Sequence, residues 1–295
     1  MPIYRMTVEY DGTKFAGWQV QPQARTVQGV LTDVLRRETG QGDIVLRGAG
    51  RTDAGVHALA QVASLECREP LAVERLLAAL ERALPADLAV RELRQLEGRF
   101  HPRHDAVLRS YRYQLARRRS AFGKRTTWWV RVPFDSRALA AAAAHLVGRH
   151  DFAALSRRDP GQTSTVVVVE ECRVADLGEL VLVRLVASHF LWGQVRRMVG
   201  ALVAVGRGEA RPDDVEGWLS GAIEPPDNAA PASGLFLERV LYRGEAQELP
   251  PLVPVGVPWF GLTTGASSER EPSPKARGSA GDGSGRRRRG VARRA

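Results

Sequence analysis

An acidic residue within a glycine-rich stretch is the first candidate for chemistry. The stretch GAGRTDAGVH, residues 48–57, places Asp53 two positions after Arg51 and four before His57. Glycines mark backbone that turns tightly or lets another molecule approach closely. Aspartate is ionised at neutral pH, and a nearby cation would keep it charged and oriented. Asp53 is therefore either a nucleophilic or electrostatic group, or the cap of an Asx-type turn.

Histidines offer two other chemistries. His57 could form a hydrolase-like dyad with Asp53, but no Gly-x-Ser-x-Gly elbow or activated cysteine supplies a nucleophile. His101 and His104, in FHPRH, are close enough in sequence to be metal ligands, but no third ligand follows in a recognised spacing. We interpret all three as loop histidines and expect no metal site. The glycines of RGAGRTDAG also lack the third glycine and the context of a dinucleotide-binding fingerprint.

Two further segments combine arginine with aromatic or apolar residues. In RSYRY an alternating strand would place Arg109, Tyr111 and Tyr113 on one face, where a tyrosine either packs in the core or meets a nucleobase. In QVRRMVG, Arg196 and Arg197 stand at the start of an apolar helix. An arginine entering such a buried face needs a partner, and Asp53 is one candidate. The alternative is that both arginines are exposed.

The elements that must position these residues form two α+β halves. In the first half, strands and helices are expected at 3–10, 26–39, 44–48, 60–66, 72–83 and 88–93. This β-α-β-β-α-β order is typical of a ferredoxin-like unit. The second half repeats it more loosely, with strands at 109–116, 127–132, 164–175, 180–187 and 235–242 and helices at 136–147, 190–206 and 211–220. We expect antiparallel sheets and domain limits of 1–104 and 105–247.

The remaining residues, 248–295, are expected to be a mostly disordered basic tail. The chain carries a net charge of +10, of which residues 266–295 contribute +6 from nine Lys/Arg and three Asp/Glu. This low-complexity segment and the moderately basic rest of the chain suggest a polyanionic partner. A need for solubility would also explain the positive charge of the rest of the chain. No apolar run reaches membrane-spanning length and no signal peptide is visible, so a cytoplasmic location is expected. The distant Cys67 and Cys172 suit a reducing compartment.

Five segments together resemble one family. They are EYDGTKFAGWQVQPQARTVQG (9–29), GAGRTDAGVHALAQV (48–62), FHPRHDAVLRSYRY (100–113), FLWGQVRRMVGALVAVGRG (190–208) and APASGLFLERVLY (230–242). In this order they are similar to the tRNA pseudouridine synthase A family over roughly residues 3–245. The resemblance implies the pseudouridine synthase fold, in which two ferredoxin-like halves form a continuous antiparallel sheet with a central cleft. It also implies a homodimer that isomerises uridines 38, 39 and 40 of the tRNA anticodon stem-loop without cofactor or metal.

The resemblance assigns roles to four residues. Asp53 matches the family's catalytic aspartate, and Arg51 matches the arginine that assists base flipping and pairs with that aspartate. Tyr111 matches the tyrosine that stacks on the target base and is proposed to move the C5 proton. Arg196 matches a basic residue lining the pocket. Whether the aspartate attacks the ribose at C1′ or the ring at C6 stays open.

Some positions depart from the family pattern. Glu81 stands where an asparagine is usual, Gln194 stands where methionine is usual, and HPRHDA replaces HARFSA. The arginine-rich tail lies outside the resemblance, so its role is open. A tRNA-binding chaperone without catalysis is the rival hypothesis, and the intact Asp53 argues against it. A DNA-binding module is a weaker one, because no groove-reading helix is recognisable.

Overall fold

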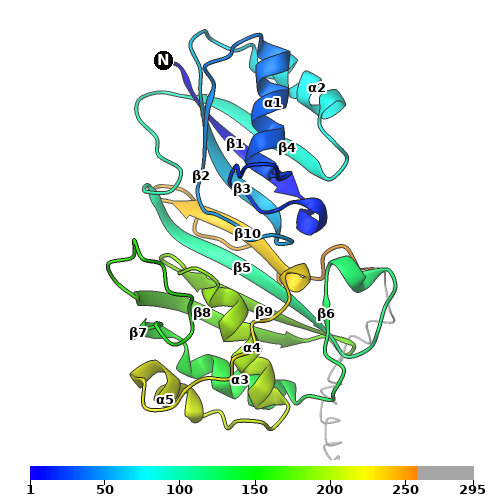
Figure 1. Cartoon of the computed structure of the whole chain (residues 1–295), viewed down its shortest axis with the longest axis vertical. Coiled ribbons are helices and arrows are strands. Elements are labelled where there is room, and N and C mark those ends of the chain that lie inside the picture. Colours follow the sequence, from blue (N-terminus) through cyan, green and yellow to red (C-terminus); the bar gives the residue numbers. More distant parts are fainter. Residues whose placement is uncertain (258–295) are drawn as a thin grey trace, which may run out of the picture. The chain divides into compact units, whose positions relative to one another are not determined.

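Ten strands form one sheet in the computed structural model, which describes residues 1–257 (Figure 1). The order along the sheet is β4-β1-β3-β10-β5-β9-β8-β7, with β2 paired to β3 and β6 paired to β5. The strands are Ile3–Tyr10 (β1), Val45–Gly48 (β2), His57–Glu66 (β3), Leu88–Leu96 (β4), Ala106–Ala116 (β5), Trp128–Trp129 (β6), Gly148–Asp151 (β7), Val166–Asp176 (β8), Leu180–Ala187 (β9) and Leu235–Tyr242 (β10). The predicted α+β class with a large, mostly antiparallel sheet is confirmed.

In the described part of the chain, five α-helices flank this sheet and close two hydrophobic cores. They are Val27–Thr39 (α1), Val73–Ala83 (α2), Ser136–His145 (α3), Gln194–Gly206 (α4) and Asp214–Ser220 (α5). The first two pack with strands β1 to β4, and the other three pack with β5, β8 and β9 (Figure 1). Thr26 caps α1 by accepting a hydrogen bond from the Gly29 N–H, and Gly40 ends it in the left-handed conformation.

Strand β10, the last strand within residues 1–257, joins the two halves. It pairs antiparallel with β5 over most of its length and parallel with β3 at Phe236–His57 and Leu237–Ala58. This short pair and the β5–β6 pair are the parallel exceptions within residues 1–257 in the expected antiparallel sheet. A parallel pair requires a long connection, which the alternating pattern of either strand does not reveal.

Several element boundaries also differ from the predicted ones. Helix α4 begins at Gln194 instead of residue 190, because Gly193 at φ 69° takes a left-handed conformation that interrupts the helix. Only two residues of the strand expected at 127–132 pair, as β6. Strand β7, with the polar sequence GRHD, was not predicted, since neither its length nor its composition is typical of a strand.

A buried ionic cluster crosses the central strands. Glu238 on β10 accepts hydrogen bonds from Ser110 (2.6 Å), from Arg184 (2.7 Å to each oxygen) and from Arg112. All four side chains are buried. Burial alone would raise the pKa of the Glu238 carboxyl, but the hydrogen bonds from Arg184 and Ser110 and the charge of Arg112 hold that pKa below its usual range.

The cluster has two cations for one carboxylate, and residues after 247 supply further acceptors. Arg184 donates to the Pro250 carbonyl, and Arg112 donates to the carbonyls of Pro251 and Val253. Gln114 exchanges two hydrogen bonds with the Val255 backbone. The first residues of the segment expected to be a tail therefore pack on the sheet, because they complete buried groups. The rest of that segment, 258–295, lies outside the described residues.

We expect Glu238→Gln to lower the free energy of unfolding by about 3–5 kcal/mol, because it leaves Arg112 and Arg184 buried without a counter-charge. Urea unfolding followed by circular dichroism measures this. The depressed pKa implies a stabilising contribution that is present above a glutamate's unfolded pKa of about 4.3 and is lost as the pH falls through the folded pKa. The control is Glu66→Gln, whose partner Arg47 is 42% exposed, and which should change stability by at most about 1 kcal/mol. Equal losses in the two variants would contradict the prediction.

Candidate active site

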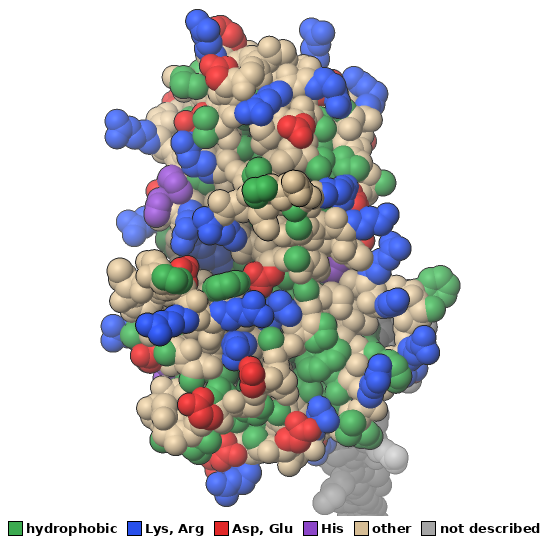
Figure 2. Space-filling view, in the orientation of Figure 1, with side chains coloured by type: hydrophobic (Ala, Val, Ile, Leu, Met, Phe, Trp, Pro, Cys, Tyr) green, Lys and Arg blue, Asp and Glu red, His purple; other side chains and the backbone are tan. Residues whose placement is uncertain are grey.

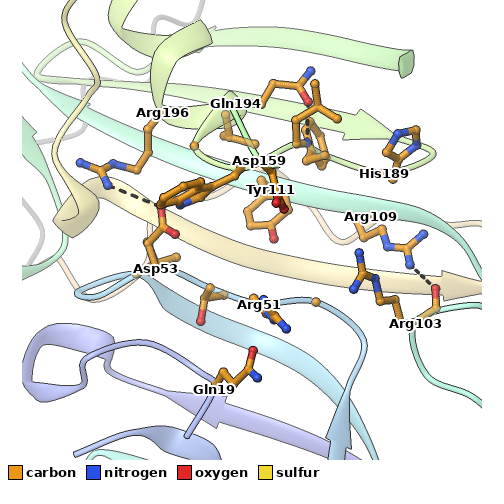
Figure 3. Close-up of a pocket in the computed structure, with 18 of the residues that line it drawn as sticks. Gln19, Arg51, Asp53, Arg103, Arg109, Tyr111, Asp159, His189, Gln194 and Arg196 are labelled. Atoms are coloured by element: carbon orange, nitrogen blue, oxygen red, sulfur yellow. Dashed lines mark hydrogen bonds and ion pairs between the residues drawn. The ribbon is translucent and has the colours of Figure 1, made fainter. Parts of the chain in front are cut away.

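A cavity of about 980 Å³ is lined by residues of both halves. The N-terminal half contributes Gln19 and the 49–54 loop, and the C-terminal half contributes β5, the 159–164 loop and the start of α4. Figure 3 shows Asp53 and Arg196 on one side of this space and Arg103 and Arg109 on the other, with Tyr111 between them and Arg51 below Tyr111. The structure thus brings all four predicted site residues to one cavity.

The Asp53 loop is held by close backbone packing against the segment that follows β1. A Cβ on Gly12 would lie 2.0 Å from the Val56 carbonyl oxygen, and one on Gly17 would lie 2.6 Å from the Thr52 oxygen. Gly17 also has a φ of 105°, which side-chain-bearing residues rarely adopt. These glycines therefore let two loops pack backbone to backbone directly behind Asp53.

Hydrogen bonds fix the residues on the N-terminal side of Asp53. The Thr52 hydroxyl lies 2.8 Å from the hydroxyl of buried Tyr10, and the Thr52 carbonyl accepts from the Trp18 N–H at 3.1 Å. The Gln61 amide donates to the Gly50 carbonyl at 2.9 Å. The Asp53 side chain is thereby presented to the cavity from an immobilised backbone.

His57, the first residue of β3, is a structural residue beside this loop. Its Nδ1 accepts from the Gly12 N–H at 3.1 Å, and its Nε2 lies 2.8 Å from the Arg125 carbonyl. Burial lowers the pKa of its imidazole despite the charge of Asp11. A neutral ring that donates from Nε2 and accepts at Nδ1 satisfies both contacts. Its nitrogens are thus engaged away from Asp53, and the hydrolase-like dyad is not formed.

Arg196 is the cation that faces Asp53. Its Nη1 lies 3.6 Å from Asp53 Oδ2, and both side chains are partly exposed (Figure 3). The guanidinium Nε donates to the Ala230 carbonyl at 2.7 Å, while the Ala230 N–H donates to the Arg196 carbonyl at 2.9 Å. These two bonds hold Arg196 against the segment before β10, so its position relative to the carboxylate is well defined.

Arg51 does not pair with Asp53, contrary to the expectation from the resemblance. Within residues 1–257 no ion pair or hydrogen bond of the Arg51 side chain is found, although it lines the same cavity. The two side chains lie apart in Figure 3, with Arg51 below Tyr111 in the view. Two residues of separation in a loop do not determine the direction of a side chain, whereas α4 brings Arg196 to the carboxylate from far along the chain.

Tyr111 lies where the two hydrophobic cores meet, and it packs against both. Its ring makes an edge-to-face contact with Phe190, with centroids 5.2 Å apart and an interplanar angle of 88°. Burial raises the pKa of the Tyr111 phenol to about 12, against the lowering effect of Arg109, and the charge of Asp53 adds to the rise. The phenol is therefore neutral at physiological pH.

One side of the cavity is strongly basic. Arg103 and Arg109 line it together with Arg51, and Arg109 is held by the carbonyls of Ser188 (2.7 Å) and Arg103 (2.5 Å). Figure 2 shows Lys and Arg side chains gathered beside a hollow between the upper and lower parts of the view. Such cations favour an anionic ligand such as a phosphate.

His101 and His104 lie in a turn that the His101 side chain stabilises. Their rings lie 4.1 Å apart, and His101 Nδ1 accepts from the backbone N–H groups of Arg103 and His104. Across residues 1–257, no cluster of three or more His, Cys, Asp or Glu side chains is arranged to hold a metal ion.

No helix within residues 1–257 has the length and apolar character needed to cross a membrane.

Sequence reasoning missed part of the lining. Asp159, Gln162 and neighbouring residues of the loop before β8 enter the cavity, and so does Trp192. The loop has no periodicity or motif that would have identified it.

Two of the positions that depart from the family pattern have different surroundings. Gln194 is buried, and its side-chain oxygen accepts a hydrogen bond from the Leu191 N–H at 2.8 Å, which fixes the turn before α4. Glu81 is exposed on α2, away from the cavity.

Comparisons with known proteins identify the family of this chain. The family model described as tRNA pseudouridine synthase matches residues 6–105 and 142–243. The tRNA pseudouridine synthases A of Pelobacter propionicus and Moorella thermoacetica are each 40% identical to this chain, over 249 and 247 residues, and each match covers 82% of this chain and 100% of the relative. That of Syntrophotalea carbinolica is 41% identical over 245 residues, covering 82% of this chain and 97% of the relative.

Both matched segments contribute to the cavity, the first with Asp53 and the second with Arg196. Tyr111 lies between the two segments and reaches the same space from β5. The family relation extends over most of the chain at an identity at which the fold is shared. The chain belongs to the tRNA pseudouridine synthase family, whose members are isomerases acting on tRNA.

Proposed function

We propose that this chain converts uridine to pseudouridine at positions 38, 39 and 40 of the tRNA anticodon stem-loop, with Asp53 as the nucleophile. The observation that carries the proposal is the Asp53 carboxylate, presented to a basic cavity, 3.6 Å from Arg196 and beside the neutral phenol of Tyr111. The relatives' tRNA pseudouridine synthase activity supports the substrate class. The stem-loop positions come from the resemblance of the GRTDAGVHA segment and its companions to the family.

The reaction requires four events at one base. The C1′–N1 bond breaks, the uracil turns, C1′ joins C5, and C5 then loses its proton while N1 gains one. A carboxylate can attack C1′ or C6, and Asp53 is placed for an electrophilic carbon in the cavity beside Tyr111. Arg196 orients that carboxylate through its anchored guanidinium. The surrounding walls retain the detached uracil while it turns.

Arg51 and Tyr111 are proposed to handle the base. Because Arg51 has no partner among the described residues, its guanidinium is available to enter the space that a flipped uridine leaves in the RNA. The Tyr111 ring can stack on the uracil inside the cavity. Its phenol is neutral in the free protein, so it would act as a proton relay rather than as a preformed phenolate. Its oxygen would take the C5 proton while the hydroxyl passes its own proton on, and N1, freed from C1′, gains a proton in the net reaction.

The assembly and location are also proposed. The family resemblance suggests a homodimer that needs no cofactor and works in the cytoplasm, where tRNA is the substrate. Phosphate contacts from Arg103 and Arg109 would give salt-sensitive affinity. The basic residues of 266–295, with a net charge of +6, would add to it if they reach the RNA.

We expect Asp53→Asn to abolish turnover while tRNA binding persists, because the amide keeps the shape of the side chain but is a poor nucleophile. The measurement is tritium release from unmodified tRNA labelled at uridine C5. Asp87→Asn is the matched control, since Asp87 pairs with Arg25 away from the cavity. Release by Asp53→Asn at the wild-type rate would refute the assignment. No release by the wild type, with tRNA binding intact, would favour the chaperone hypothesis.

We expect Tyr111→Phe to keep KM close to the wild-type value, because the ring can still stack, but to lower kcat about 100-fold or more through loss of the proton relay. Since the phenol's pKa is raised to about 12, the free enzyme's Tyr111 stays protonated between about pH 7 and pH 10. The kcat/KM profile of the wild type should therefore show no inflection from this group in that range. A kcat unchanged in Tyr111→Phe would remove the phenol from the mechanism.

A further inference from the structure

Trp192 is a large aromatic side chain left half in water at the cavity. It is 49% exposed, and it also lines the cavity that contains Asp53 and Tyr111. Trp192 is thus not part of a hydrophobic core, and its exposed ring lies at the candidate site. Its ring therefore contacts both the cavity and solvent.

The turn before α4 holds this ring in place. The Trp192 carbonyl accepts a hydrogen bond from the Arg157 N–H at 2.8 Å, and the Arg157 guanidinium carbon lies 5.3 Å from the Trp192 ring centroid. Gly193, at φ 69°, supplies the left-handed conformation that this turn needs, and the Arg157 stem lies beside it. Gln194 accepts from the Leu191 N–H and closes the same turn. The result is an aromatic ring with a cation over it, on a defined backbone.

The same turn reaches the site of the proposed chemistry. Phe190, two residues before Trp192, contacts the Tyr111 ring edge-to-face at 5.2 Å. A uracil stacked on Tyr111 would therefore occupy the cavity only a short turn of chain away from Trp192. A flipped nucleotide is covalently linked to its neighbours in the RNA, so a neighbouring base is brought to the mouth of the cavity at the same time.

We propose that Trp192, with Arg157 over its ring, is a stacking platform for an unpaired nucleobase next to the target uridine. The inference rests on the proposed function. Aromatic rings stack on any of the four bases, and a guanidinium adds a cation–π contribution and a charge for the adjoining phosphate. Trp192 is thus a positioning residue that fixes the register of single-stranded RNA and does not select a base by hydrogen bonding.

The chain contains a matched control. Trp129 on β6 is 36% exposed and has the Arg131 guanidinium carbon 5.4 Å from its ring centroid, but it does not line the cavity. Trp129 therefore resembles Trp192 in being partly exposed and in contacting an arginine, but it lies outside the cavity. Any effect of removing an exposed tryptophan as such should therefore be seen at both positions.

The first test measures binding of an anticodon stem-loop RNA in the Asp53→Asn background, where turnover does not interfere. We expect Trp192→Ala to weaken binding by about 5- to 150-fold, the range for loss of one base–aromatic stack. Trp192→Phe should lose less, because a phenyl ring still stacks, and Trp129→Ala should bind as the parent does. In the Asp53-containing enzyme, Trp192→Ala should raise KM and leave kcat nearly unchanged.

The second test is spectroscopic. The same RNA carries 2-aminopurine at the nucleotide on either side of the target, and its fluorescence should fall on binding at one of these positions. Trp192→Ala should abolish that quenching and Trp129→Ala should preserve it. Folding of each variant is verified by its circular dichroism spectrum and, in the Asp53-containing enzyme, also by tritium release.

The outcomes separate the two proposals. If the wild type releases tritium but Trp192→Ala matches it in KM, affinity and quenching, the platform is refuted while the enzyme function stands. If Trp192→Ala lowers kcat and leaves KM and affinity unchanged, the residue acts in another way and the platform is likewise refuted. Failure of the wild type to release tritium would instead count against the proposed function.

Discussion

The pairing of β10 with two partners is the constraint on which the site depends. On one edge it runs parallel to β3, whose first residue follows the Asp53 loop, and on the other it runs antiparallel to β5, which carries Tyr111. The two reactive side chains come from different halves of the chain. Their common cavity therefore exists only when the last strand has been inserted between those halves. The buried Glu238 cluster lies on this strand and holds β5, β9 and β10 together.

The arginines of the buried Glu238 cluster and those of the cavity differ in how their charges are compensated. In the buried cluster every arginine is satisfied by a carboxylate or by backbone carbonyls, which suits a fixed structural element. In the cavity only Arg196 is neutralised by Asp53, while Arg51 keeps its charge available. A site that receives a polyanion needs such uncompensated cations. The Asp53 carboxylate among them must also keep its orientation, which requires a rigid loop. The glycine contacts behind Asp53 meet that requirement.

Local patterns in the sequence predicted many elements correctly, and the misses have physical causes. Alternation identified β1 and β5, and helical spacing with a threonine cap identified α1, because these signals reside within single elements. The start of α4 was misplaced because one glycine takes a left-handed conformation that its neighbours do not encode. Strand β7 pairs only because β8 is present, so its own four residues carry little signal.

The sequence by itself determined the family, the candidate residues Asp53, Arg51, Tyr111 and Arg196, and the need for a partner for a partly buried arginine. Only the tertiary structure decided that Asp53 faces Arg196 instead of Arg51, and that His57 is bound away from the carboxylate. It also placed Trp192 at the cavity. The reason is that spacing along the chain restricts only neighbouring residues. Which distant side chains meet is set by strand order and by the turns between elements.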